Sequence, residues 1–96
     1  MGTRPRPDHG RQIAAARAVL RMSTKDLAAA SGLHEKSVSY NERKRLLPRY
    51  AHAADSIGKA LTGLGVSFET RAGGGFAVVF SAAAVEASPT NAAARF

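Results

Sequence analysis

The chain has 96 residues, no cysteine and a formal net charge of +7. This length suits one domain with a modest core, and the lack of cysteine excludes disulfides, thiolate metal sites and a cysteine nucleophile. No apolar stretch approaches the ~20 residues that would span a bilayer, so we expect a soluble, cytoplasmic protein without a membrane partner. Residues 1–50 hold eleven Lys and Arg against four Asp and Glu, and the later charges cancel. This half is expected to meet a polyanion, unless it is simply a solvated basic surface.

Residues 1–10 are predicted to form a flexible basic arm. Pro5 and Pro7 cannot donate helix hydrogen bonds, and the segment offers nothing apolar that could dock it.

Residues 11–65 carry a helical pattern. An alanine-rich first helix is expected from Arg11 to Arg21 or Met22. A second helix is expected over Thr24–Ser31, where Ser23 would cap the amino terminus and Asp26 would suit the helix dipole.

A turn at Gly32 separates the second helix from a third. Glycine readily adopts the left-handed conformation that is needed just past a helix end. The third helix is expected from His34 or Glu35 to Glu42, followed by the basic residues 43–45 and by Pro48. A fourth helix, over Arg49–Leu64, places its apolar residues at the three- and four-residue spacing of a core-facing stripe.

Residues 66–80 change to a period of two, which indicates a β-hairpin with a glycine turn at residues 73–75. Residues 81–96 contain too little apolar bulk to pack, so a mostly disordered tail is predicted, with at most a transient helix over residues 82–87. The predicted fold class is therefore mainly α, with four or five helices and a C-terminal β-hairpin.

The segment from Ser23 to Glu42 is the most specific pattern in the chain. It resembles the Cro and phage-repressor class of helix-turn-helix regulators, also called the xenobiotic-response-element class, and the resemblance covers about Gln12 to Leu64. Apolar residues at Leu27, Leu33 and Val38 would form the wedge between the two helices, while Ala28 and Gly32 suit their close crossing and the turn. In this arrangement the second helix of the pair lies in the major groove of DNA.

The resemblance also implies an ion pair. In this class an arginine of the first helix pairs with a glutamate near the end of the recognition helix, and the matching residues are Arg17 and Glu42. We expect this pair to be partly buried and to tie the first helix to the third, although two solvated charges would be the simpler alternative.

The resemblance assigns DNA contacts to the start of the second helix and to the third helix. Lys36 could donate to guanine, Glu35 could accept from cytosine, and Tyr40 could pack on a thymine methyl or donate to phosphate. Thr24 stands where the class has a phosphate-contacting glutamine. The full set of predicted DNA-binding residues is Thr24, Lys25, His34, Glu35, Lys36, Ser39, Tyr40, Arg43, Lys44 and Arg45. The alternative for each is an ordinary exposed helix residue.

One position departs from the pattern of the class. Asn41 stands where a bulky apolar residue usually turns inward, so its amide must find hydrogen bonds or stay near water. We expect either a slightly rotated third helix or an end that frays before Arg43.

Each of the two flanking segments has two alternative roles. Arg4 and Arg6 of the arm could enter a narrow minor groove, or the arm could merely aid solubility. The hairpin needs a cover for its apolar face, which either the fourth helix or a second copy of the chain could supply. We favour a homodimer, with dimerisation residues Phe68, Phe76, Val78 and Phe80.

Catalytic patterns are absent from the sequence. The histidines His9, His34 and His52 lack metal-ligand spacing, and the three consecutive glycines lack the lysine and helix of a phosphate loop. We therefore predict no enzyme activity, no metal and no cofactor. The expected function is sequence-specific binding of double-stranded DNA by a nucleoid-associated repressor. The alternative is an antitoxin-like protein that grips a protein partner through the hairpin and residues 81–96.

Overall fold

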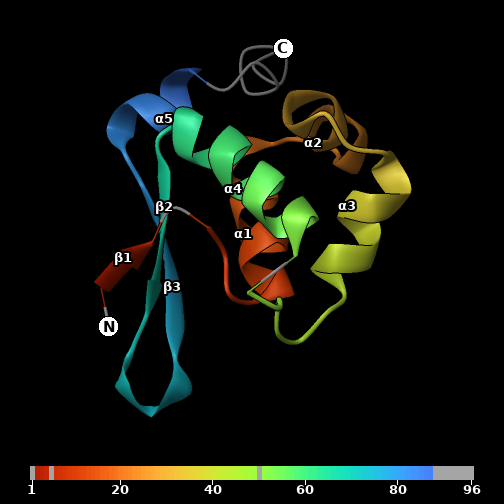
Figure 1. The fold of residues 1–96 in the computed structure, drawn as a ribbon. Helices are drawn as coiled ribbons and strands as arrows, with labels where there is room; N and C mark the ends of the chain where they lie inside the picture. Colours follow the sequence, from red (N-terminus) through yellow and green to blue (C-terminus); the bar gives the residue numbers. More distant parts are fainter. Residues whose placement is uncertain (1, 5, 50, 88–96) are drawn as a thin grey trace.

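The computed structural model describes residues 2–4, 6–49 and 51–87. Within this part, the chain forms five α-helices, a short 3-10 turn and a three-stranded antiparallel sheet of order β1-β2-β3. Figure 1 shows the helices gathered on one side of the molecule, with the sheet along the other side and its hairpin extending beyond the helices. In chain order the elements are β1 (Gly2–Arg4), α1 (Gly10–Leu20), α2 (Thr24–Ser31), α3 (Glu35–Glu42), α4 (His52–Gly63), β2 (Val66–Thr70), η1 (Ala72–Gly74), β3 (Phe76–Phe80) and α5 (Ala82–Ala87).

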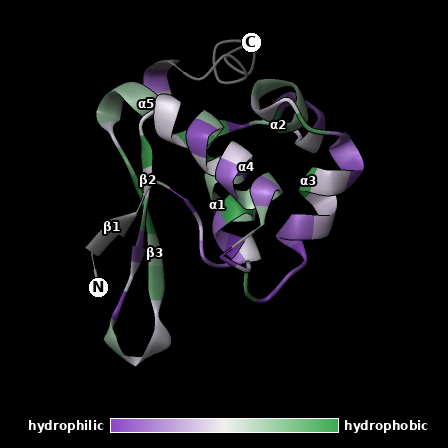
Figure 2. Cartoon of the chain, viewed as in Figure 1, coloured by the Kyte–Doolittle hydropathy of each residue, from purple (hydrophilic) through white to green (hydrophobic). Residues whose placement is uncertain are grey.

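The core lies between the helices and the inner face of the sheet. Its largest fully buried apolar side chains come from all of α1 to α4 and from β2: Ile13, Leu20, Leu27, Val38, Ile57, Leu61, Val66 and Phe68. Figure 2 shows hydrophilic residues on α2, on α3 and on the loop after α3, whereas β3 is largely hydrophobic. No helix in the described part of the chain is both long and apolar enough to cross a membrane.

The predicted helices are present, and the largest shift of a boundary is at the start of α4. α2 begins as expected, since the Ser23 hydroxyl accepts from the Asp26 amide and the Asp26 carboxylate accepts from the Ser23 amide, both at 2.9 Å. α4 begins at His52, three residues later than predicted. Before it, the carbonyls of Pro48 and Arg49 accept hydrogen bonds from the Arg6 guanidinium at 2.7 and 2.8 Å, and the Pro48 carbonyl also accepts from the Ala51 amide in a turn.

The prediction of a flexible arm over residues 1–10 is wrong for the residues that the structure describes. β1 pairs antiparallel with β2, with Gly2 opposite Thr70 and Arg4 opposite Phe68. Pro7 is buried, and Arg6 also pairs with Asp55 at 3.0 Å, so Arg6 is not available to a minor groove. The arm orders because the outer edge of β2 offers backbone partners that a two-stranded hairpin would leave unpaired.

The first turn of α1 is joined to the sheet by the side chain of Gln12, which is completely buried. Its carbonyl oxygen accepts from the amides of Asp8 and His9 at 2.8 and 3.1 Å, and its Nε2 donates to the carbonyl of Ala77 at 3.0 Å. One polar side chain therefore caps the helix and fixes β3 against it.

The chain after the hairpin is more ordered than predicted. α5 covers residues 82–87, its residue Ala84 is buried, and the Ser81 hydroxyl accepts from the Ala84 amide at 3.0 Å. This packing needs a glycine at position 65, where φ is +92° and an added Cβ would collide with Ser81 and Ala84. The predicted disorder is therefore wrong for 82–87, and residues 88–96 lie outside the described part of the chain.

Gly10 marks a close approach between α1 and the end of α3. Its amide donates to the carbonyl of Lys44 at 3.0 Å, and a Cβ added here would collide with the backbone carbonyl oxygens of Asn41, Glu42 and Lys44. Backbone atoms cannot move aside as a flexible side chain can, so the two elements would have to separate.

We predict that Gly10→Ala lowers the free energy of unfolding by about 1–3 kcal/mol, because it overpacks this contact. The control is Gly63→Ala at the end of α4, where nothing lies within 4 Å of the added Cβ. This variant should be neutral or slightly more stable. Urea denaturation of both variants measures the difference, and equal stability would contradict the predicted steric role of Gly10.

Candidate nucleic-acid interface

Helices α2 and α3 pack as a pair around a three-residue connection, Gly32 to His34. Gly32 has φ +70°, and the Leu33 amide donates to the carbonyl of Ala28 at 2.9 Å, which closes the end of α2. The side chains of Leu27 and Val38 are fully buried between the helices. In Figure 1, α3 lies at the side of the molecule opposite the sheet, so its outer face remains open.

A shallow hollow of about 670 Å³ lies on this outer face. All six of its lining residues belong to the predicted DNA-binding set. We call this surface the α3 face: His34, Glu35, Lys36, Ser39, Tyr40 and Arg43. The helical repeat of α3 places these side chains near one another, and the described part of the fold leaves them uncovered.

Interactions within and beside the α3 face hold several of these side chains in place. The Thr24 hydroxyl donates to the Glu35 carboxylate at 2.9 Å, so the first residue of α2 is tied to the first residue of α3. Since the hydroxyl proton is used there, Thr24 cannot donate it to a phosphate at the same time. The Lys44 ammonium lies 4.5 Å from the centre of the Tyr40 ring, and Tyr40 remains 56% exposed. Lys25 is exposed on α2.

The ion pair between Arg17 and Glu42 is present and has two hydrogen bonds. Arg17 Nε and Nη2 donate to the two carboxylate oxygens at 2.6 and 3.0 Å, and Nη1 donates to the carbonyl of Met22 at 3.0 Å. The side chains are 25% and 12% exposed. One guanidinium therefore connects α1, the last residue of α3 and the segment before α2, and so fixes the angle at which α3 is presented.

Glu42 also raises the pKa of Arg17 above its usual value, mainly through the hydrogen bond, which outweighs the opposing effect of burial, with a smaller contribution from Coulombic attraction. The stability linked to a raised pKa is complete at low pH and is lost only as the pH rises through that pKa. The charge of Arg17 is therefore constant throughout the neutral range.

We predict that Arg17→Met lowers the free energy of unfolding by about 1–3 kcal/mol, since it leaves the largely buried Glu42 carboxylate without its partner. Arg71→Met is the matched control, because it breaks the exposed Arg71–Glu69 pair of the hairpin. An exposed pair of this kind should contribute less than about 1 kcal/mol. Thermal denaturation at neutral pH compares them, and similar losses would contradict the role assigned to Arg17.

Asn41 turns inward at the position where the resemblance to the Cro and phage-repressor class led us to expect an apolar residue. It is 4% exposed, and its Nδ2 donates to the carbonyl of Ser37 at 2.8 Å. The Asn41 Nδ2 thus has a hydrogen-bond partner within α3 itself, and α3 continues to Glu42. The expected fraying before Arg43 does not occur.

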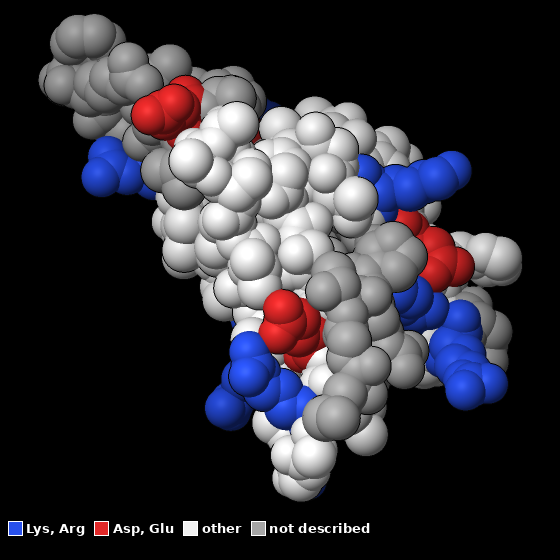
Figure 3. Space-filling model, turned by 90° about the vertical axis from the view of Figure 1, so that its left-hand side faces the viewer, with Lys and Arg blue, Asp and Glu red and all other residues white. Residues whose placement is uncertain are grey.

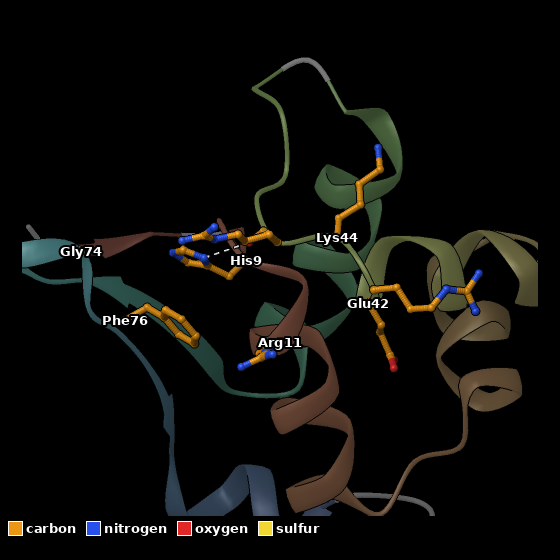
Figure 4. Close-up of a pocket in the computed structure, with 8 residues that line it drawn as sticks. His9, Arg11, Glu42, Lys44, Gly74 and Phe76 are labelled. Carbon is orange, nitrogen blue, oxygen red and sulfur yellow. Dashed lines mark hydrogen bonds between the residues drawn. The ribbon is translucent and has the colours of Figure 1, made fainter.

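A second, larger hollow of about 880 Å³ lies between the start of α1, the segment after α3 and the hairpin turn. We call it the hairpin hollow; its lining residues are His9, Arg11, Glu42, Arg43, Lys44, Arg45, Gly74 and Phe76. Figure 4 shows the rings of His9 and Phe76 side by side, with Arg11 near them and the Lys44 ammonium directed away. The ring centroids are 4.2 Å apart, and His9 Nδ1 lies 3.0 Å from the carbonyl of Arg45, to which it donates.

Sequence reasoning missed the roles of His9, Arg11 and Gln12. For Gln12 a signal existed, because it stands four and eight residues before Ala16 and Leu20 and so shares their buried face. No such periodicity marks the hairpin hollow, whose walls come from three separate segments.

The predicted dimerisation residues are mostly used within the chain. Phe68 is fully buried in the core, Val78 and Phe80 pack against the core, and Phe76 stacks on His9. The prediction that Phe68 serves a dimer interface is therefore wrong, because the helices already cover the inner face of the sheet. Val79, which was not predicted, is 41% exposed on β3.

Comparison of the chain with protein-family models, with curated proteins and with solved structures gave no match. Among the described residues, no three His, Cys, Asp or Glu side chains lie close enough together to hold a metal ion.

Proposed function

We propose that this chain binds double-stranded DNA sequence-specifically, with α3 in the major groove, as a transcriptional regulator that resembles the Cro and phage-repressor class. The observation that carries the proposal is that every described residue lining the α3 face belongs to the DNA-contacting set that the sequence pattern predicts. The proposal involves no catalytic residue and no cofactor.

The chemistry of the α3 face suits base edges and phosphates. Lys36 can donate to the guanine acceptors N7 and O6, and Glu35 can accept from a cytosine amine. The hydrogen bond from Thr24 orients Glu35, which favours a single readout geometry. Arg43 and Lys44, at the end of α3, supply charge for the phosphate backbone.

We propose further that the protein acts as a homodimer that pairs through β3. β1 covers the outer edge of β2, whereas β3 is the other edge strand of the described sheet and has the apolar sequence FAVVF. Figure 3 looks from the side of the sheet: uncharged residues occupy most of the middle of this face, and Lys and Arg lie toward its margins. A dimer would place two α3 helices on half-sites one helical turn apart, ~34 Å. Occupying a promoter in this way would repress transcription.

The first experiment is selection of bound sequences from random duplex DNA, followed by titration of the selected duplex against a scrambled one. Tight binding of a palindromic motif is expected. Equal, steeply salt-dependent binding to both duplexes would contradict specific recognition and would favour the antitoxin-like alternative.

We predict that the double variant Lys36→Glu/Arg43→Glu loses binding to the selected duplex by at least about 100-fold, since it removes a base contact and reverses charge at the backbone. The control Lys59→Glu/Arg71→Glu changes the net charge equally on α4 and on the hairpin, away from the α3 face. It should keep most of the affinity. Circular dichroism checks that both variants are folded, and retained affinity in the first variant would refute the assignment of α3.

We predict that Val79→Glu converts the dimer into a monomer in sedimentation equilibrium, because it places a charge beside the pairing edge. Val19→Glu is the matched control, because Val19 is similarly exposed, at 44%, but lies on α1. A dimer that survives in Val79→Glu, or a wild-type monomer, would show that β3 does not pair.

A further inference from the structure

The hairpin hollow adjoins the α3 face. Arg43 lines both hollows, so one continuous surface extends from α3 past the end of that helix to the hairpin turn. A long ligand that lies along the α3 face can therefore continue into the hairpin hollow.

The charge of the hairpin hollow is strongly positive. Arg11, Arg43, Lys44 and Arg45 line it, and Arg11, Arg43 and Arg45 are exposed. Among the described residues that line it, the only carboxylate is that of Glu42, and both oxygens of this group accept hydrogen bonds from Arg17. The Lys44 ammonium lies over the Tyr40 ring, whereas Figure 4 shows Arg11 near Phe76 of β3. The carbonyl of Arg45 accepts from His9, which stacks on Phe76, so the backbone of Arg45 also lies beside the hairpin.

The walls of the hairpin hollow are held together by specific contacts. His9 donates to the carbonyl of Arg45 and stacks on Phe76, with an angle of 24° between the rings. Gln12 holds the carbonyl of Ala77, the next residue of β3, against the start of α1. These contacts hold β3 against the start of α1 and the backbone of the segment after α3, so little backbone ordering is needed when a ligand binds.

We propose that the hairpin hollow binds the sugar-phosphate backbone of DNA next to the base pairs that α3 contacts, with Arg11 and Arg45 donating to phosphate oxygens. This inference depends on the function proposed above and extends it to a second contact site. Guanidinium groups match phosphate oxygens in both charge and geometry. The continuity of the hairpin hollow with the α3 face favours the backbone of the same DNA over an acidic peptide. Contacts of this type add affinity that does not depend on sequence and that weakens with salt.

The test uses Arg11→Gln and Arg45→Gln in the full chain, with Arg71→Gln as the control of equal charge change. Arg71 belongs to the same hairpin region but does not line the hollow, and its side chain is 63% exposed. Binding is titrated at several salt concentrations on the selected and the scrambled duplex. Each hollow variant should reduce the slope of log affinity against log salt by about 0.9 on both duplexes. In Arg11→Gln and Arg45→Gln, the ratio of affinity for the selected duplex to affinity for the scrambled duplex should equal that of wild type. Arg71→Gln should keep the wild-type slope.

A second arm locates the phosphate. Duplexes with one neutral methylphosphonate at a time are titrated against wild type and Arg11→Gln. We expect that one methylphosphonate, outside the base pairs of the selected motif, lowers the affinity of wild type but not that of Arg11→Gln.

The outcomes separate the two proposals. If wild type binds the selected duplex specifically but the hollow variants keep its salt slope, or lose no more than Arg71→Gln does, the hairpin hollow is not a phosphate site and the role of α3 stands. The same conclusion follows if no methylphosphonate lowers the affinity of wild type without also lowering that of Arg11→Gln. If wild type binds neither duplex, the proposed function fails and this inference fails with it.

Discussion

The backbone at the start of α1 approaches the backbone at the end of α3 so closely that only glycine fits at position 10. The Gly10 amide donates to the carbonyl of Lys44, and the Leu47 amide donates to the carbonyl of Asp8. These contacts join two segments more than thirty residues apart, and the hairpin hollow lies beside them. The direction of α3, the course of residues 43–45 and the position of the hairpin all depend on this junction.

Polar side chains extend the junction in two directions. Gln12 connects it to the sheet through the carbonyl of Ala77, and Arg17 connects α1 to Glu42 and to the segment before α2. Gln12 is fully buried, Arg17 is mostly buried, and both make several hydrogen bonds. Removing the partners of either side chain would therefore lower the free energy of unfolding. In a chain of 96 residues with a modest core, such contacts define one arrangement of helices where apolar packing alone would tolerate several.

The distribution of charge follows from the same framework. The basic residues 43–45 directly follow α3, and the junction with α1 directs this segment toward the hairpin. Arg17 neutralises the one carboxylate at the end of α3, so the surface from the α3 face to the hairpin hollow is dominated by cations. A polyanion is the partner that such a surface suits best.

Much of the helical half could be predicted from the sequence alone, because caps, turns and apolar spacing act over a few residues. Ser23, Gly32 and the stripe of α4 set their elements locally, and the spacing within α3 was enough to place Lys36, Ser39 and Tyr40 on one surface. Tertiary structure alone decided that residues 2–4 become a strand, that Phe68 is buried and that His9, Arg11 and Phe76 meet. These outcomes depend on segments distant in sequence that supply backbone partners or apolar cover to one another, and no local pattern records which distant segment will do so.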